Sequence, residues 1–345
     1  MSKVTNNGHR TGALTVALAT LLLASAFAGC LSGDGSGDKV SLVQTGSSTV
    51  LPLAEAWAQE FDGADIAVSG GGSSHGLKEL LEKRADLGDA SRVLKGSDYE
   101  AVGGNKSLVR SDGTVAGPAP SGVTPEKWVV AYDVLAVVVN KDNTWAPTLN
   151  YSQLFKIFTN ATPAVYWDEV PGLSGAPHQK ISIYAPDEAS GTYDYFFESI
   201  IKDWGKPTQV AKTRLEHGDG VYHPSADDNV ILNAIKSDKY AIGYFGFAYL
   251  VENPGAVKAV ALAKTGSTGV EPSFANVASY PMARPLHIYT DGIPSTTSEK
   301  GKAIREYLMF ILGEDGQALV PQVGYVRLSL VNATIVATQL ARLGS

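Results

Sequence analysis

The chain has 345 residues, of which 44% are hydrophobic and 18% charged, a composition typical of a globular protein with room for two domains. Its formal net charge of −7 becomes −9 if residues 1–29 are removed, because these include Lys3 and Arg10 and no acidic residue. This acidic balance excludes nucleic acid as a partner, because binding a phosphate backbone needs a stripe of basic residues. It does not exclude a small anion, which local dipoles can bind in a cleft.

The N-terminal residues are typical of an export signal. The apolar run 13–28 follows a weakly basic start, which favours a secretory signal peptide over residues 1–29 rather than a transmembrane helix. Cys30 is the only cysteine, so no intramolecular disulfide is possible. It follows a segment that resembles a lipoprotein cleavage box, and we expect it to be lipidated, an incidental cysteine being the alternative. Residues 30–38 are rich in Gly, Ser and Asp and predict a flexible tether.

From about residue 39, short apolar strands alternate with helices. This alternation is typical of βαβ units and a mostly parallel sheet. We expect strands at 40–43, 66–68 and 87–90, and helices at 51–61 and 74–83. Residues 96–127 are rich in Gly, Ser and Pro and predict surface excursions. The nearly continuous apolar run 134–140 then predicts a strand that is covered on both faces.

A second α/β set follows Pro147. Its expected helices cover 151–158, 191–203 and 228–236, and its expected strands cover 181–184, 240–244 and 257–262. A returning strand at 285–289 and a helix at 297–312 end the pattern. This order predicts two lobes joined by two crossings, with lobe 1 made of residues 39–132 plus 284–345 and lobe 2 of residues 133–283.

Four polar loops rich in Ser, Thr and Gly accompany these elements, most of them directly before a helix. They are residues 46–49, 70–74, 89–92 and 189–192. A helix N-terminus carries unpaired N–H groups and a partial positive charge, and hydroxyl groups add further donors. Although each loop alone could be a plain helix cap, their number favours a site for a small oxyanion beyond the carboxyl ends of the strands.

The order of these motifs also resembles a known family. The segments Gly46-Ser-Ser-Thr-Val50, Gly71-Gly-Ser-Ser-His-Gly76, Ala85-Asp-Leu-Gly-Asp-Ala-Ser-Arg92, Ala189-Ser-Gly-Thr-Tyr-Asp-Tyr-Phe196, His223-Pro-Ser-Ala-Asp-Asp-Asn229, Ile242-Gly-Tyr-Phe-Gly246 and Tyr280-Pro-Met-Ala-Arg-Pro-Leu286 resemble the phosphate-binding proteins of high-affinity phosphate ABC importers. The resemblance covers roughly residues 40–325. It implies a two-lobed, type II-like periplasmic-binding-protein fold, with two mixed sheets flanked by helices and joined by two crossing strands.

The resemblance also implies a function and a set of ligands. The chain would be a non-enzymatic, monomeric lipoprotein without a cofactor, anchored through Cys30 on the outer face of the cytoplasmic membrane, which hands inorganic phosphate to a membrane permease. The lobes would move about hinges near 131–140 and 280–288. The residues that it places around the anion are Ser48, Thr49, Ser73, Ser74, Ser91, Arg92, Ser190, Gly191 and Thr192.

Two positions depart from the family pattern. Ser91, or Arg92 one residue later, stands where described bacterial members have an Asp that accepts the phosphate proton, and Pro186 stands where they have an Arg. We therefore expect Asp89 to be the carboxylate that selects phosphate over sulfate, because an ionised carboxylate can only accept a hydrogen bond. Asp187 and Glu188 are the reserve candidates.

Two other functions remain open from the residues. Gly72-Ser73-Ser74-His75-Gly76 matches the G-x-S-x-G elbow of a serine hydrolase, with Asp228 and His287 as possible partners. However, Ser74 follows only the second strand, and no His-Gly-Gly-type oxyanion segment precedes it. The protein could also be a receptor or sensor for another oxyanion, such as sulfate or molybdate. The six histidines show no metal-ligand spacing, so no metal site is expected.

Overall fold

The computed structural model describes residues 39–159, 165–188, 190–202, 215 and 220–344. The predicted signal peptide, the tether and Cys30 lie outside these ranges. From Lys39 onward the chain forms one compact unit. No helix in the part of the chain that the structure describes has both the length and the apolar character needed to cross a membrane.

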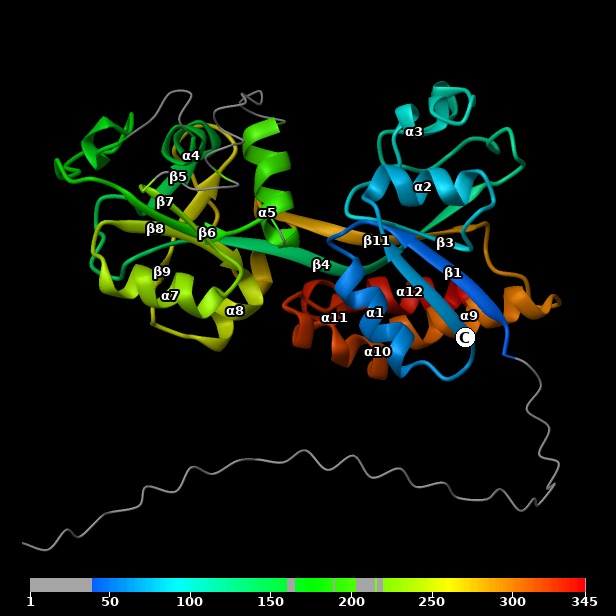
Figure 1. Ribbon diagram of the computed structural model, residues 1–345. Helices are drawn as coiled ribbons and strands as arrows, with labels where there is room; N and C mark the ends of the chain where they lie inside the picture. Colours follow the sequence, from blue (N-terminus) through cyan, green and yellow to red (C-terminus); the bar gives the residue numbers. More distant parts are fainter. Residues whose placement is uncertain (1–38, 160–164, 189, 203–214, 216–219, 345) are drawn as a thin grey trace, which may run out of the picture. The chain divides into compact units, whose positions relative to one another are not determined.

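The N-terminal βαβ pattern is confirmed. The strands are β1 (Ser41–Gly46), β2 (Asp65–Gly70) and β3 (Leu87–Ala90), and the helices are α1 (Leu51–Glu60) and α2 (Ser73–Leu81). β1 lies between β2 and β3 and pairs in parallel with both. Parallel pairing brings the carboxyl ends of the three strands to one edge, and the loops that lead into α1 and α2 start there (Figure 1).

A long strand, β4 (Pro125–Val139), carries the chain from one lobe to the other (Figure 1). It starts at residue 125 rather than 134, because Asp133 separates the apolar residues 128–132 from the run that predicted the strand. The expected surface excursion therefore ends sooner and contains α3 (Gly96–Glu100) and the 3-10 turn η1 (Lys106–Leu108).

The second lobe contains the expected α/β set and several short additions. Its elements are β5 (Thr148–Asn150), α4 (Tyr151–Phe158), β6 (Ser182–Pro186), α5 (Gly191–Phe196), β7 (Tyr222–Ser225), α7 (Asp228–Ser237), β8 (Ala241–Gly246), α8 (Phe247–Glu252), β9 (Lys258–Ala259) and β10 (Ala261–Ala263). The helix expected at 191–203 is α5 followed by a π-helical stretch, Phe197–Lys202. The strand expected at 257–262 is divided, because β9 pairs with β4 and β10 pairs with β5.

The returning strand, β11 (Ala283–Asp291), lies antiparallel between β3 and β4. The last five residues of β4 pair with β8, whereas its earlier part pairs with β11. The two expected sheets are thus linked through β4 into one nine-stranded mixed sheet in the order β2-β1-β3-β11-β4-β8-β6-β7, with β9 beside β4 and a separate pair of β10 and β5.

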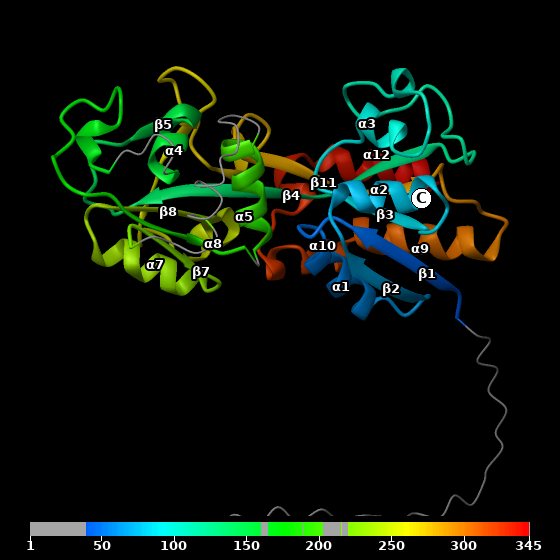
Figure 2. The same cartoon turned by 45° about the horizontal axis from the view of Figure 1, so that its top comes forward.

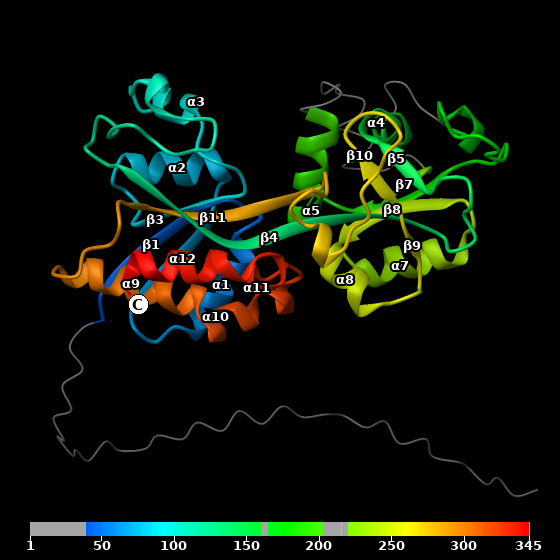
Figure 3. The same cartoon turned by 180° about the vertical axis from the view of Figure 1, so that it is seen from behind.

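Helices cover both faces of the sheet in the first lobe. α2 packs on one face, while α1 and four C-terminal helices lie on the other (Figures 2 and 3). These four are α9 (Glu299–Leu312), α10 (Glu314–Leu319), α11 (Leu328–Val331) and α12 (Ala333–Leu343). Further 3-10 turns are η2 (Trp167–Glu169), η4 (Phe274–Asn276) and η5 (Pro321–Val323).

Each lobe has its own buried core. In lobe 2 the core surrounds the end of β4 and includes Val137, Phe158 and Tyr244. In lobe 1 one cluster lies around Trp57 and Tyr307 between the sheet and the C-terminal helices, and a smaller one lies under α2. Separate cores are typical of two lobes that each pack their own helices against the sheet. The lobe boundaries at 132/133 and 283/284 stay a prediction.

Candidate functional site

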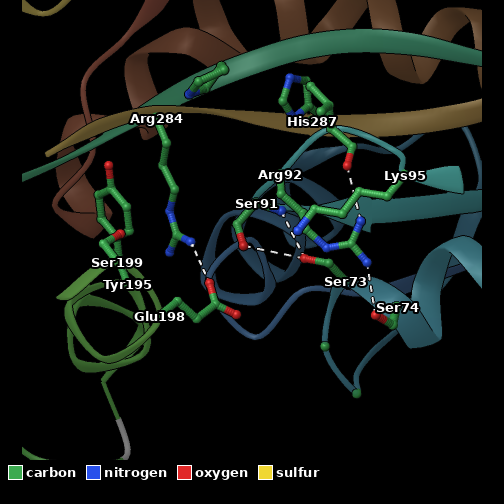
Figure 4. A pocket seen from close by; sticks show the side chains of 14 residues that line it. Ser73, Ser74, Ser91, Arg92, Lys95, Tyr195, Glu198, Ser199, Arg284 and His287 are labelled. Carbon is green, nitrogen blue, oxygen red and sulfur yellow. Dashed lines mark hydrogen bonds and ion pairs between the residues drawn. The ribbon is translucent and has the colours of Figure 1, made fainter. Parts of the chain in front are cut away.

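One cavity, called the large cavity below, has a volume of about 510 Å³. Lobe 1 contributes the start of α2 and the loop after β3, lobe 2 contributes the end of α5 and the π-helical stretch, and β11 contributes Arg284, Pro285 and His287 (Figure 4). The residues that line it are Gly71, Gly72, Ser73, Ser74, Ser91, Arg92, Val93, Lys95, Tyr195, Glu198, Ser199, Arg284, Pro285 and His287.

The start of α2 forms one wall of this cavity. Gly71 and Gly72 have φ angles of 149° and 87°, a region that favours glycine, and they turn the chain directly into the helix. Gly76 lets α2 approach the sheet, since a Cβ there would lie 2.4 Å from the carbonyl oxygen of Thr45. The first amides of a helix lack an intrahelical acceptor, so this end of α2 offers N–H donors to an anion.

Hydroxyl groups from two loops meet at the same place. Ser73 Oγ accepts a hydrogen bond from the backbone N–H of Ser91 at 3.1 Å and lies 3.3 Å from Ser91 Oγ. Ser74 Oγ accepts a hydrogen bond from Arg92 Nη2 at 2.8 Å. The hydroxyl protons of Ser73 and Ser74 can therefore be donated to a ligand.

Arg92 is held in one orientation by a carboxylate behind it. Its Nη1 and Nη2 each donate to Asp98 at 2.8 Å, a bidentate pair, and Nη1 also donates to the carbonyl of Val93. The Asp98 side chain is 5% exposed. Although burial lowers the pKa of Arg92, the hydrogen bond with Asp98 and the charges of Asp98 and other nearby groups together outweigh it, and the net pKa lies above its usual value. Arg92 thus presents a fixed positive charge to the cavity.

Arg284 is the second guanidinium of the cavity. Nε donates to Asp133, Nη1 to Glu198 and Nη2 to Thr49 Oγ1, each at 3.1 Å, and the guanidinium lies 3.9 Å from the centre of the Tyr195 ring. Asp133 and Arg284 are register partners on β4 and β11. Burial raises the pKa of Asp133, and the positive charge of Arg284 opposes this rise.

Four of the sequence-predicted site residues come together in this cavity, namely Ser73, Ser74, Ser91 and Arg92. The loop of residues 190–192 lines a different cavity of about 300 Å³, together with Asp187 and Asp228. In that loop Ser190 Oγ accepts a hydrogen bond from the backbone N–H of Thr192 at 3.2 Å, so Ser190 acts as the N-cap of α5.

Thr49 connects the two cavities. Its Oγ1 accepts a hydrogen bond from Arg284 in the large cavity, and its carbonyl accepts one at 2.8 Å from Tyr325, which lines the smaller cavity. A Cβ added to Gly191 would lie 3.1 Å from the Thr49 Cα, so the loops that precede α1 and α5 are in close contact.

Four predicted residues, Ser48, Thr49, Asp89 and Glu188, line neither cavity. Ser48 and Glu188 are exposed. Asp89 is 1% exposed, and its Oδ1 accepts a hydrogen bond from Gln44 Nε2 at 2.9 Å inside lobe 1. Burial raises the pKa of Asp89 to about 8. Its predicted role in selecting phosphate over sulfate stays a prediction.

Sequence reasoning assigned no ligand role to Lys95, Tyr195, Glu198 or Arg284. The clearest signal was available for Arg284, which interrupts an apolar strand at the expected crossing. A charge in such a strand must be paired or functional. Glu198 lies in the middle of a helical pattern and gives no signal of its own.

The hydrolase alternative gains no support from the geometry. Ser74 Oγ is hydrogen-bonded to the Arg92 guanidinium, and Asp228 lines the other cavity. His287 shares the cavity with Ser74, but burial lowers its pKa to about 3, which makes it a poor general base. The described residues also contain no group of three or more His, Cys, Asp or Glu side chains that could hold a metal ion.

Comparisons with known proteins point to one family. The family described as "PBP superfamily domain" matches residues 32–315. Protein SphX of Synechococcus elongatus is 32% identical over 318 residues, which cover 90% of this chain and 83% of SphX. The phosphate-binding protein PstS of Staphylococcus aureus is 28% identical over 90% of this chain and 86% of its own length.

Solved structures agree with the two-lobed α/β fold. A possible phosphate binding protein from Planctomyces limnophilus is 28% identical, has a TM-score of 0.71, and is matched over 89% of this chain and 99% of its own. An ABC-type phosphate transport receptor from Vibrio cholerae is 20% identical with a TM-score of 0.57, covering 83% of this chain and 99% of the receptor. The expected fold class is thereby confirmed.

Proposed function

Because the chain belongs to the PBP superfamily, we propose that it is a substrate-binding protein that captures inorganic phosphate for an ABC importer. The observation that carries this proposal is the meeting of Ser73, Ser74, Ser91 and Arg92 at the start of α2 in the large cavity. The relatives whose printed names state phosphate binding support the choice of anion.

The chemistry of this wall suits a tetrahedral oxyanion. The hydroxyls and the first amides of α2 are hydrogen-bond donors, and Arg92 adds a positive charge whose direction is fixed by Asp98. Donors of this kind stabilise an anion without attacking it. We therefore infer that the protein binds and releases phosphate without chemical turnover.

Lobe 2 supplies the second half of the site in this proposal. Thr49 and residues 190–192 would donate to the anion when the lobes close about hinges near 131–140 and 280–288. The close contact between Gly191 and Thr49 supports this, since it brings the start of α5 to the start of α1.

We further propose that the protein works outside the cytoplasm as a monomer. A signal peptide over residues 1–29 would direct export, and lipidation of Cys30 would anchor the tether of residues 30–38 to the membrane beside the permease. Cys30→Ala should release the protein from the membrane fraction into the medium. Retention of this variant in the membrane fraction would exclude the lipid anchor.

The function is tested by calorimetric titration of residues 31–345 with phosphate, sulfate and molybdate. We expect one phosphate site per chain and weaker binding of the other two anions. Ser73→Ala removes one donor to a charged group and should weaken phosphate binding about tenfold or more. The control is Ser237→Ala, an exposed serine at the end of α7. Absence of phosphate binding would refute the proposal, and tighter sulfate or molybdate binding would change the anion.

A further inference from the structure

Arg284 has donor capacity that its protein partners do not use. A guanidinium carries five N–H groups, and the three hydrogen bonds to Asp133, Glu198 and Thr49 use one each. Arg284 is 9% exposed, yet it lines the large cavity. Its remaining N–H groups belong to Nη1 and Nη2, the two nitrogens that face Glu198 and Thr49 rather than the β4 strand.

The two carboxylates on Arg284 are not equivalent. Asp133 is on the neighbouring strand, and its side chain is 3% exposed. Glu198 comes from the π-helical stretch of lobe 2, and its side chain is 49% exposed. Figure 4 shows the Glu198 carboxylate next to the Arg284 guanidinium, joined to it by a dashed line. Breaking the ion pair with Arg284 costs Glu198 little free energy, because water can solvate its half-exposed carboxylate. Breaking the pair with Asp133 would instead leave an unpaired charge buried.

Glu198 is also the only acidic side chain among the described residues that line this cavity. The cationic lining residues are Arg92, Lys95 and Arg284, and Arg92 is paired with Asp98. With both Asp133 and Glu198 in place, the group around Arg284 is negative overall and repels an incoming anion. Without Glu198 in contact, Asp133 and Arg284 form a neutral pair that still has N–H donors for an anion.

We propose that Arg284 contacts the bound anion directly and that the Glu198 carboxylate occupies its guanidinium only while the cavity is empty. The anion displaces Glu198 from Nη1, and Glu198 turns into the solvent. Glu198 thereby lowers the affinity of the protein by competing for the same donors. This inference rests on the proposed function, because it concerns the same cavity and the same anion.

Glu198→Gln tests the competition. Glutamine keeps the shape of the side chain but removes its charge, so phosphate should bind about fivefold more tightly, the order expected for the loss of a half-exposed ion pair. Glu100→Gln is a matched control: the Glu100 side chain is also 49% exposed and pairs with Lys106 at 2.8 Å, on α3 and outside the cavity lining. It makes the same change in net charge and should alter phosphate affinity by less than about twofold.

Nuclear magnetic resonance of ¹⁵N-arginine-labelled protein tests the contact. The Arg284 guanidinium signal is identified by its loss in Arg284→Lys or, if that variant does not fold, by its shift in Glu198→Gln. Saturating phosphate should move this signal in the wild type. If calorimetry finds no phosphate binding, the proposed function fails as a whole. If phosphate binds but this signal stays in place, or Glu198→Gln binds no more tightly than Glu100→Gln, only the present inference is overturned.

Discussion

At the scale of single residues, Asp89 shows how burial changes the behaviour of a carboxyl group. Its Oδ2 is buried and has no hydrogen-bond partner among the described residues. The folded protein therefore favours the protonated form, with a pKa of about 8, while the unfolded chain has the ordinary value near 3.8. A raised pKa of this kind contributes stability below the unfolded pKa, and that contribution is lost as the pH rises through the folded pKa.

Asp89→Asn should remove this pH dependence. Asparagine keeps an acceptor for Gln44 and cannot ionise, so the variant should gain free energy of unfolding relative to the wild type between about pH 4 and pH 8, by on the order of 5 kcal/mol at most. Urea unfolding at several pH values measures this, with the fully exposed Asp62→Asn as the control. Parallel curves for the wild type and Asp89→Asn would contradict a raised pKa.

The same variant also tests the sequence-based role of Asp89. Asp89 lines neither cavity, and a purely structural role would leave the ratio of phosphate to sulfate affinity in Asp89→Asn equal to that of the wild type. If phosphate binding weakened while sulfate binding gained, Asp89 would be the selective carboxylate after all.

Ser190 and Thr192 test whether lobe 2 contributes ligands. If their hydroxyls donate to the anion in the closed protein, the double variant Ser190→Ala/Thr192→Ala should bind phosphate about tenfold more weakly or worse. Calorimetry on the variant, with circular dichroism to check the fold, measures this. Unchanged affinity would leave this loop as the N-cap of α5 only.

At the scale of elements, the position of α2 depends on Gly76. An added Cβ would meet the backbone of Thr45 at 2.4 Å and of Gly46 at 2.5 Å, and backbone atoms cannot move aside cheaply. Gly76→Ala should therefore push α2 off the sheet, lower the stability by about 1–3 kcal/mol and weaken phosphate binding, because Ser73 starts the same helix.

Gly117→Ala is the control for this prediction. A Cβ at Gly117 would meet its nearest neighbour at 3.7 Å, an ordinary contact, so this variant should unfold at the wild-type urea concentration. Equal midpoints for Gly76→Ala and Gly117→Ala would show that close packing of α2 is not required.

Elements with a local signal could be predicted from the sequence. Helix α4 was predicted with its observed ends, because Asn150 and Gln153 form a capping box in front of a clear apolar period. The length of β4 could not be predicted, since its first half mixes buried residues with partly buried ones such as Glu126 and Lys127. The contact of Arg284 with Glu198, 86 positions apart, joins β11 to the π-helical stretch Phe197–Lys202, and no local pattern encodes this meeting.

At the scale of the whole described unit, Asp133 and Arg284 are register partners on β4 and β11, the two strands at which we predict the lobes to be joined. Because the proposed ligands come from both lobes, binding should draw the lobes together about these strands. Small-angle scattering should show a smaller radius of gyration with saturating phosphate than with sulfate at the same ionic strength. An unchanged radius would rule out hinge closure.

The most direct test of the central claim is a crystal structure of residues 31–345 grown with one molar equivalent of phosphate. The account predicts a single phosphate in the large cavity, within hydrogen-bond distance of Ser73 and of the Arg92 guanidinium, with Ser190, Gly191 or Thr192 on its other side. A phosphate bound by neither Ser73 nor Arg92, or a cavity that stays empty under these conditions, would contradict it.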